Sequence, residues 1–146
     1  MKNPDPKIFI TLLLLLISPY PVFATDYACT IKSVLKLNDS GQYIAHGWTA
    51  NYLNREFTVN RETGKVISTT ALKARLTNFD KTHNPIVLLN PNEKSSYKVV
   101  TVFEDKGQFS SLRIDENVEN NAKPYSYQTA VGMLLTGTCI GEPSDN

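Results

Sequence analysis

The fold is decided by a stretch that reads EFTVNRETGKVI and covers residues 56–67. Its first residues alternate between polar and apolar side chains, a glycine stands in its centre, and it ends on a second apolar run. A short alternating strand, a glycine-containing turn and a returning strand predict a β-hairpin. Phe57 and Val59 are expected to face the core, because successive side chains of a strand point to opposite faces.

Similar strand-like segments lie on both sides of this hairpin. They cover 27–37, 42–53, 86–89, 97–104, 109–115, 125–129 and 131–140. Runs of turn-forming residues separate several of them, for example Asn38-Asp39-Ser40-Gly41. The segment at 86–89 is apolar throughout and is expected to be a buried strand. The segment at 69–84 is compatible with one amphipathic helix or with a loop that contains a short helix.

About seven or eight short strands at near-regular spacing, with at most one short helix, predict an all-β fold. The expected architecture is a small antiparallel barrel or a barrel-like sandwich. An immunoglobulin-type sandwich is an alternative, because Cys29, Trp48 and Cys139 occur in that order. Its core disulfide would join cysteines that are closer in sequence, and its corner tyrosine would fall at position 137, which is glycine. A barrel is therefore favoured, with an interior that side chains fill.

The first 24 residues have the pattern of a signal peptide. Lys2 and Lys7 give a positive start, the run 8–17 is apolar apart from one threonine, and Val22-Phe23-Ala24 fits a cleavage site. The run is shorter than the roughly 20 apolar residues that span a bilayer, which argues against a retained anchor. Processing after Ala24 would export one β domain, residues 25–146, to the periplasm or the exterior, with no stable insertion into a membrane.

Removal of the leader also balances the charge. The full chain has 15 basic and 14 acidic side chains, and the leader contains Lys2, Lys7 and Asp5, so the remainder has a formal net charge of zero. A nucleic-acid binder normally carries a positive excess. Nucleic acid and anionic membrane surfaces are therefore not expected as partners.

The chain contains two cysteines, Cys29 and Cys139, about 110 residues apart. In an oxidising compartment such a pair predicts a disulfide. A redox site would need Cys-x-x-Cys and a zinc site would need four ligands at short spacing, and the sequence has neither pattern. Because a disulfide requires the two Cα atoms to lie within about 7 Å, the first and last strands are expected to be neighbours.

Residue patterns typical of catalysis are missing from the sequence. His46 and His83 belong to no metal-binding motif, and no Gly-x-Ser-x-Gly nucleophile motif occurs. No catalytic residue, metal or cofactor is therefore assigned, and the chain is not expected to be an enzyme. The candidate binding residues are aromatic side chains that either contact a ligand or fill the core: Tyr43, Trp48, Tyr52, Tyr125 and Tyr127.

Five short segments of the sequence carry a resemblance. They are FTVNRETG at 57–64, SYKV at 96–99, LRID at 112–115, KPY at 123–125 and TGTC at 136–139. In these segments the chain resembles small exported bacterial proteins of unassigned function. The resemblance implies a periplasmic or secreted setting, and it provides no catalytic or binding residues to transfer.

Two functions are compatible with these observations. The first is a non-catalytic binding module that holds a ligand or an envelope component through a surface patch or the open end of the barrel. The second is a proteinaceous inhibitor or immunity factor against a secreted hydrolase such as a lysozyme, because a rigid loop loses little entropy on binding. The candidate inhibitory loop consists of Asn92, Glu93, Lys94, Ser95 and Ser96. An ordinary polar turn would also account for these residues.

Overall fold

A single antiparallel sheet forms the body of the molecule. The computed structural model describes residues 26–68, 73–88 and 95–141. Within these ranges the strands are β1 (Tyr27–Leu37), β2 (Tyr43–Ala45), β3 (Glu56–Val59), β4 (Val66–Ile67), β5 (Ile86–Leu88), β6 (Ser96–Phe103), β7 (Gln108–Asp115), β8 (Ala122–Gln128) and β9 (Leu134–Gly141). The short helices α2 (Thr49–Tyr52) and α3 (Lys73–Leu76) and the 3₁₀ turn η2 (Glu104–Lys106) lie between strands. The predicted signal peptide lies outside the described residues.

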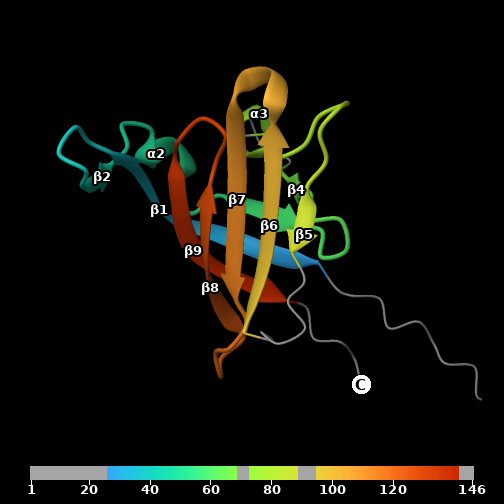
Figure 1. Cartoon of the computed structure of the whole chain (residues 1–146). Coiled ribbons are helices and arrows are strands. Elements are labelled where there is room, and N and C mark those ends of the chain that lie inside the picture. Colours follow the sequence, from blue (N-terminus) through green and yellow to red (C-terminus); the bar gives the residue numbers. More distant parts are fainter. Residues whose placement is uncertain (1–25, 69–72, 89–94, 142–146) are drawn as a thin grey trace, which may run out of the picture.

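The sheet runs in the order β4-β3-β1-β9-β8-β7-β6-β5, and β2 pairs with the far end of β1. It curves into a half-barrel that remains open between β4 and β5 (Figure 1). The predicted all-β, barrel-like fold is therefore confirmed. The first and last strands are neighbours as expected, and Cys29 of β1 lies directly opposite Cys139 of β9.

The hairpin predicted at 56–67 is present. β3 and β4 pair antiparallel, with Thr58 opposite Ile67 and Val59 opposite Val66. Phe57, Val59 and Val66 are all buried, as the alternation predicts. Local alternation and a glycine turn are sufficient to specify this element, because its pairing involves residues close in sequence.

A bulge in β1 explains why its alternation is imperfect. The register to β9 shifts between Ile31 and Ser33, so the strand has one extra residue there. Such an insertion reverses the face to which later side chains point. Cys29 and Ile31 are buried before the bulge, and Val34 is buried after it. Leu37, which strict alternation from Cys29 and Ile31 would place on the core side, is exposed.

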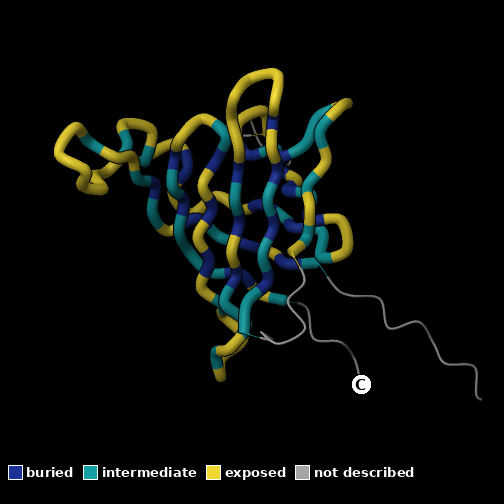
Figure 2. The backbone as a smooth tube through the Cα atoms, in the orientation of Figure 1, coloured by how far each residue is buried: buried dark blue, intermediate teal, exposed yellow. Residues whose placement is uncertain are grey.

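Large side chains fill the concave side of the sheet, as the sequence predicts. Buried positions run along the middle of most strands, whereas the turns are exposed (Figure 2). The ring of Phe57 meets the ring of Tyr125 edge-on at 5.4 Å between centroids. The hydroxyl of Tyr127 donates to the backbone oxygen of Leu76 at 2.6 Å, which attaches α3 to the core. The interior therefore combines aromatic packing with a few buried hydrogen bonds.

Although β4 and β5 do not pair, the turn between β3 and β4 covers the gap between these two edges. Gly64 has φ of +72°, and a Cβ atom there would lie 2.7 Å from Val99 Cγ1, so the turn packs directly on β6. The hydroxyl of Tyr97 donates to the backbone oxygen of Arg61 at 2.9 Å. Only glycine combines a left-handed backbone with this close approach. The turn thus takes the place of a closing strand pair.

The side chain of Asn78 protects the free edge of β4. Its Oδ1 accepts the backbone N–H of Val66 at 2.8 Å, and its Nδ2 donates to the backbone oxygen of Gly64 at 2.9 Å. Asn78 is 1% exposed, so both bonds are made in a buried setting. The amide acts like one residue of an additional strand and satisfies an edge that would otherwise have unpaired backbone groups.

Replacing Asn78 with alanine is expected to lower the free energy of unfolding by about 2 kcal/mol. The substitution leaves a buried N–H and a buried C=O without partners, and each such group costs roughly 1–3 kcal/mol before water compensates. Urea denaturation followed by circular dichroism measures the change. Asn84→Ala, at an exposed position, is the matched control and should unfold at the wild-type midpoint. Equal midpoints for the two variants would contradict the role given to Asn78.

The prediction of one strand over 42–53 is wrong beyond Ala45, where the chain turns into α2. Local hydrogen bonds account for this: the Thr49 hydroxyl donates to the backbone oxygen of His46 at 2.6 Å, and His46 Nδ1 accepts the N–H of Trp48 at 3.0 Å. Polar side chains that bond nearby backbone compete with extended pairing. Asn54 then adopts φ of 59°, a conformation that asparagine tolerates, and the chain enters β3.

The expectation of a buried strand at 86–89 is also corrected. β5 is a three-residue strand at the end of the sheet order, and Ile86 and Leu88 are exposed. Only Val87 turns toward the core. A strand at the edge of a half-barrel has one face open to solvent, so an apolar run does not by itself establish burial. The segment expected to contain one helix, 69–84, contains α3 within its described part.

Candidate functional site

An open groove lies at one end of the half-barrel. We call it the end groove; its volume is about 630 Å³. Its walls come from α3 and the segment that follows it, from the β6–η2–β7 connection, and from the loop between β8 and β9 (Figure 1). The lining residues are Lys73, Ala74, Arg75, Thr77, Phe79, Asp80, Phe103, Lys106, Gln108, Ala130 and Val131.

The charge of the end groove is positive. It contains three cations, and its one carboxylate, on Asp80, is already occupied. Asp80 Oδ1 accepts the N–H of Thr82 at 2.9 Å and that of His83 at 2.8 Å, while Oδ2 accepts from Lys106 Nζ at 3.0 Å. These bonds, the one from Thr82 first, hold the pKa of Asp80 far below its usual range. Lys73 and Arg75 have no carboxylate partner among the described residues and are available to a ligand.

We expect Asp80→Asn to flatten the acid side of the stability curve. A carboxyl whose pKa is lower in the folded than in the unfolded state stabilises the fold above the unfolded pKa, here 3.8, and loses that effect as the pH falls below it. The wild type should therefore lose more thermal stability between pH 7 and pH 3 than the variant. Thermal unfolding at both pH values measures this difference. Asp39→Asn, at an exposed carboxylate in the β1–β2 turn, is the control; a parallel loss in wild type and Asp80→Asn would refute the expectation.

Each of three aromatic rings at the end groove carries a cation. The Arg75 guanidinium carbon lies 3.6 Å from the centroid of Trp48, Lys65 Nζ lies 4.9 Å from that of Phe79, and Lys106 Nζ lies 5.1 Å from that of Phe103. Cations over aromatic faces are attracted by the ring quadrupole. Phe79 and Phe103 belong to the lining, and Trp48 adjoins the groove through Arg75, so the three rings hold positive charge in and beside the groove.

A second surface projects beside the end groove. We call residues 35–48 the arm; it consists of the end of β1, the following turn and β2, and it extends away from the sheet in Figure 1. Leu37 and Tyr43 are each 58% exposed. The turn is internally fixed, because Asn38 Oδ1 accepts the backbone N–H groups of Ser40 and Gln42 at 3.0 and 2.8 Å. The arm thus presents exposed apolar side chains on an ordered support.

The structure divides the five aromatic residues predicted as binding candidates. Tyr43 and Trp48 lie on the arm, and Trp48 also reaches the end groove through Arg75. Tyr52, Tyr125 and Tyr127 are buried in the core. Burial raises the pKa values of the Tyr125 and Tyr127 hydroxyls above the ordinary tyrosine range. Of the five candidates, the first two are therefore the ones whose side chains are exposed.

Most of the predicted inhibitory loop lies outside the described residues. Asn92, Glu93 and Lys94 lie outside the described residues. The backbone oxygen of Ser95 accepts the N–H of Glu116 at 2.9 Å, and Ser96 begins β6 opposite Asp115. The described part of this loop is therefore connected to the end of β7.

Sequence patterns gave no signal for the groove cations. Lys73 and Arg75 lie in a segment that was ambiguous between helix and loop, and Lys106 lies in a predicted turn, where solvated charge is the usual explanation. Their convergence depends on the curvature of the sheet, which brings α3 beside the β6–β7 connection.

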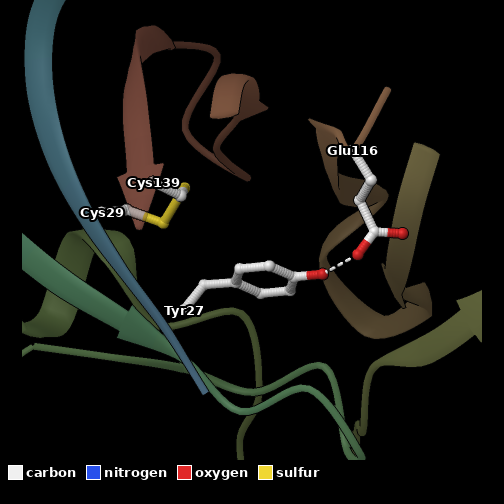
Figure 3. The surroundings of a disulfide bond; sticks show 4 residues. All are labelled: Tyr27, Cys29, Glu116 and Cys139. Carbon is white, nitrogen blue, oxygen red and sulfur yellow. Dashed lines mark hydrogen bonds between the residues drawn. A yellow bond between two sulfur atoms is a disulfide. The ribbon is translucent and has the colours of Figure 1, made fainter. Parts of the chain in front are cut away.

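The disulfide lies away from the groove and is structural. The two sulfur atoms are bonded, the Cα atoms are 3.9 Å apart, and both cysteines are fully buried. Near it, Tyr27 donates its hydroxyl to Glu116 (Figure 3). Arg61 pairs with the same carboxylate oxygen at 2.8 Å. Burial first, and then this bond to Glu116, raises the pKa of Tyr27. This cluster closes the end of the half-barrel opposite the groove.

The described residues contain no group of three or more histidine, cysteine or acidic side chains arranged to hold a metal ion. His83 lies between two carboxylates, with Nδ1 2.9 Å from Asp80 and Nε2 3.4 Å from Asp105. Since Asp80 also bonds the His83 backbone, these contacts tie the 80–83 turn to η2.

None of the helices in the described ranges is long and apolar enough to cross a bilayer.

The fold and the groove together define a disulfide-tied, all-β half-barrel with a cationic groove at one end. Comparisons with family models, curated proteins and solved structures found no match to the chain.

Proposed function

We propose that this chain is an exported, non-catalytic binding protein that holds its ligand in the end groove. The observation that carries the proposal is a groove lined by aromatic rings and by cations, of which Lys73 and Arg75 have no carboxylate partner among the described residues. Ligand-binding sites are typically concave and combine apolar walls with a few charged groups. The buried disulfide and the predicted leader are compatible with a site of action outside the cytoplasm.

The test maps ligand binding onto the backbone. The full chain, leader included, is expressed in ¹⁵N-enriched medium. The folded, labelled product is then titrated with fractions of a bacterial envelope. We expect saturable shifts of amides around the end groove. The double variant Lys73→Gln/Arg75→Gln should lower the binding affinity about tenfold or more, since a charge-assisted bond contributes about 1.5–3 kcal/mol. Arg55→Gln/Arg113→Gln, which removes the same charge at exposed positions outside the groove, is the matched control. Titrations that leave the groove amides unshifted would overturn the proposal.

A second candidate function, an inhibitor or immunity factor against a secreted hydrolase such as a lysozyme, is favoured by the arm. Its fixed turn and exposed Tyr43 and Ile44 would enter a partner's cleft with little loss of conformational entropy. Pull-down from a native envelope followed by mass spectrometry is the test. Capture of one stoichiometric hydrolase that is lost in Tyr43→Ser/Ile44→Ser but kept in Lys73→Gln/Arg75→Gln would support inhibition. Capture that depends on the groove variant alone would support the first function.

A further inference from the structure

We propose that the end groove recognises a short acidic peptide segment, with Arg75 as the group that binds a carboxylate. This inference rests on the proposed function, because it requires the end groove to be the ligand site. It names the class of ligand and the residue that would distinguish an acidic from a neutral one.

Arg75 is prepared for such a contact. Its guanidinium carbon lies 3.6 Å from the Trp48 centroid, and His46 packs beside the same ring at 4.9 Å between centroids. A guanidinium that rests on a ring keeps donors at its edge for a carboxylate, which it binds in a two-pronged manner. Since the ring restricts the side chain before the ligand arrives, less conformational entropy is lost on binding.

The charge around Arg75 favours an anion. Lys73 is on the same helix, and Lys65 and Lys106 are placed over the two phenylalanine rings. Lys106 is paired with Asp80, whereas Lys73 and Arg75 remain without a carboxylate among the described residues. Two available positive charges beside one neutralised carboxylate match a ligand with two or more negative groups.

The apolar part of the groove favours a peptide over an acidic saccharide. A sugar ring stacks on an open aromatic face, but here Trp48 and Phe79 each carry a cation, and Phe103 is only 5% exposed. The lining includes the exposed apolar side chain of Val131, which is 56% exposed and follows Ala130. Small aliphatic contacts of this kind suit the side chains of a peptide. The ligand class is therefore a segment in which acidic residues alternate with apolar ones.

Trp48 provides a direct readout, because the chain contains one tryptophan. The probe is an acetylated and amidated hexapeptide of alternating glutamate and valine, titrated into the folded protein at low salt. We expect a saturable change in Trp48 fluorescence, with shifts confined to groove amides in ¹⁵N spectra. Arg75→Gln should weaken binding about tenfold, Arg75→Lys should restore part of it, and Arg113→Gln should bind as the wild type does. Raising the salt concentration should also weaken binding.

The alternatives give distinguishable results. Equal affinity for the hexapeptide with glutamine in place of glutamate would overturn the acidic requirement. Binding of trigalacturonate but not of the peptide would overturn the peptide class in favour of an acidic saccharide. If none of these probes binds while an envelope fraction still shifts the groove amides, the ligand class is wrong and the proposed function stands. If neither the probes nor the envelope fractions bind, both the ligand class and the proposed function are wrong.

Discussion

Replacing both cysteines with serine, Cys29→Ser/Cys139→Ser, is expected to lower the free energy of unfolding by about 4 kcal/mol. The bond closes a loop with a sequence separation of 110 residues, and chain-entropy models assign such a loop roughly 4–5 kcal/mol. Small domains have about 5–15 kcal/mol of stability in total, so the variant should keep only part of it. Guanidinium denaturation of the oxidised wild type and of the variant measures the difference.

Reduction of the wild type provides the control for this experiment. Both cysteines are fully buried, so the native protein should resist a mild reductant and become sensitive only when it unfolds. Once reduced in denaturant and allowed to refold under reducing conditions, it should match the double-serine variant. If the double-serine variant unfolds at the wild-type midpoint, the disulfide does not stabilise the fold by lowering the conformational entropy of the unfolded chain.

Gly137→Ala is the substitution with the next largest expected effect, a loss of about 3 kcal/mol or more. A Cβ atom at this position would lie 2.0 Å from the backbone oxygen of Thr30 and 3.0 Å from the backbone nitrogen of Lys32. Overpacking typically costs about 1–3 kcal/mol. Here the obstructing atoms belong to the backbone of the bulged strand β1, so no side-chain rotation relieves the clash. Urea denaturation of the variant measures the loss.

Gly47→Ala is the matched control. A Cβ atom at Gly47 has no neighbour within 4 Å, and its backbone conformation is an ordinary one. Its stability should therefore stay within about 0.5 kcal/mol of the wild type, as for other surface substitutions. If both glycine variants unfold at the same denaturant concentration, the bulge in β1 does not require glycine opposite it.

Elements that depend on neighbouring residues were predictable from the sequence. The hairpin at 56–67 follows from alternation and one glycine, and the pairing of Cys29 with Cys139 follows from their being the two cysteines of a chain with a predicted leader. These two features are enough to place the first and last strands side by side. The β1 bulge was visible only as an irregularity at Ser33 and Val34, and the pairing places Gly137 of β9 opposite Ile31, where the bulge begins.

Two kinds of feature were not predictable: local hydrogen bonds that end a strand, and contacts between distant segments. The strand expected over 42–53 ends at Ala45 because Thr49 and His46 bond nearby backbone, and an aromatic-rich pattern does not reveal this. The end groove was missed for a similar reason: Arg75 and Lys106 belong to short elements without periodicity. Of the aromatic candidates, Trp48 is exposed, but the guanidinium that accompanies it comes from a segment 27 positions later.

The pairing of Tyr27 with Gly141 places both ends of the described fold next to each other. The end groove is lined by Ala130 and Val131, beyond the opposite end of β9, so the eight residues of this strand separate it from both ends of the described fold. An attachment made next to Tyr27 or Gly141, to a sensor chip or to a fused carrier, therefore lies at the end of the fold opposite the groove. Protein immobilised through either of these two positions should keep its full ligand-binding capacity.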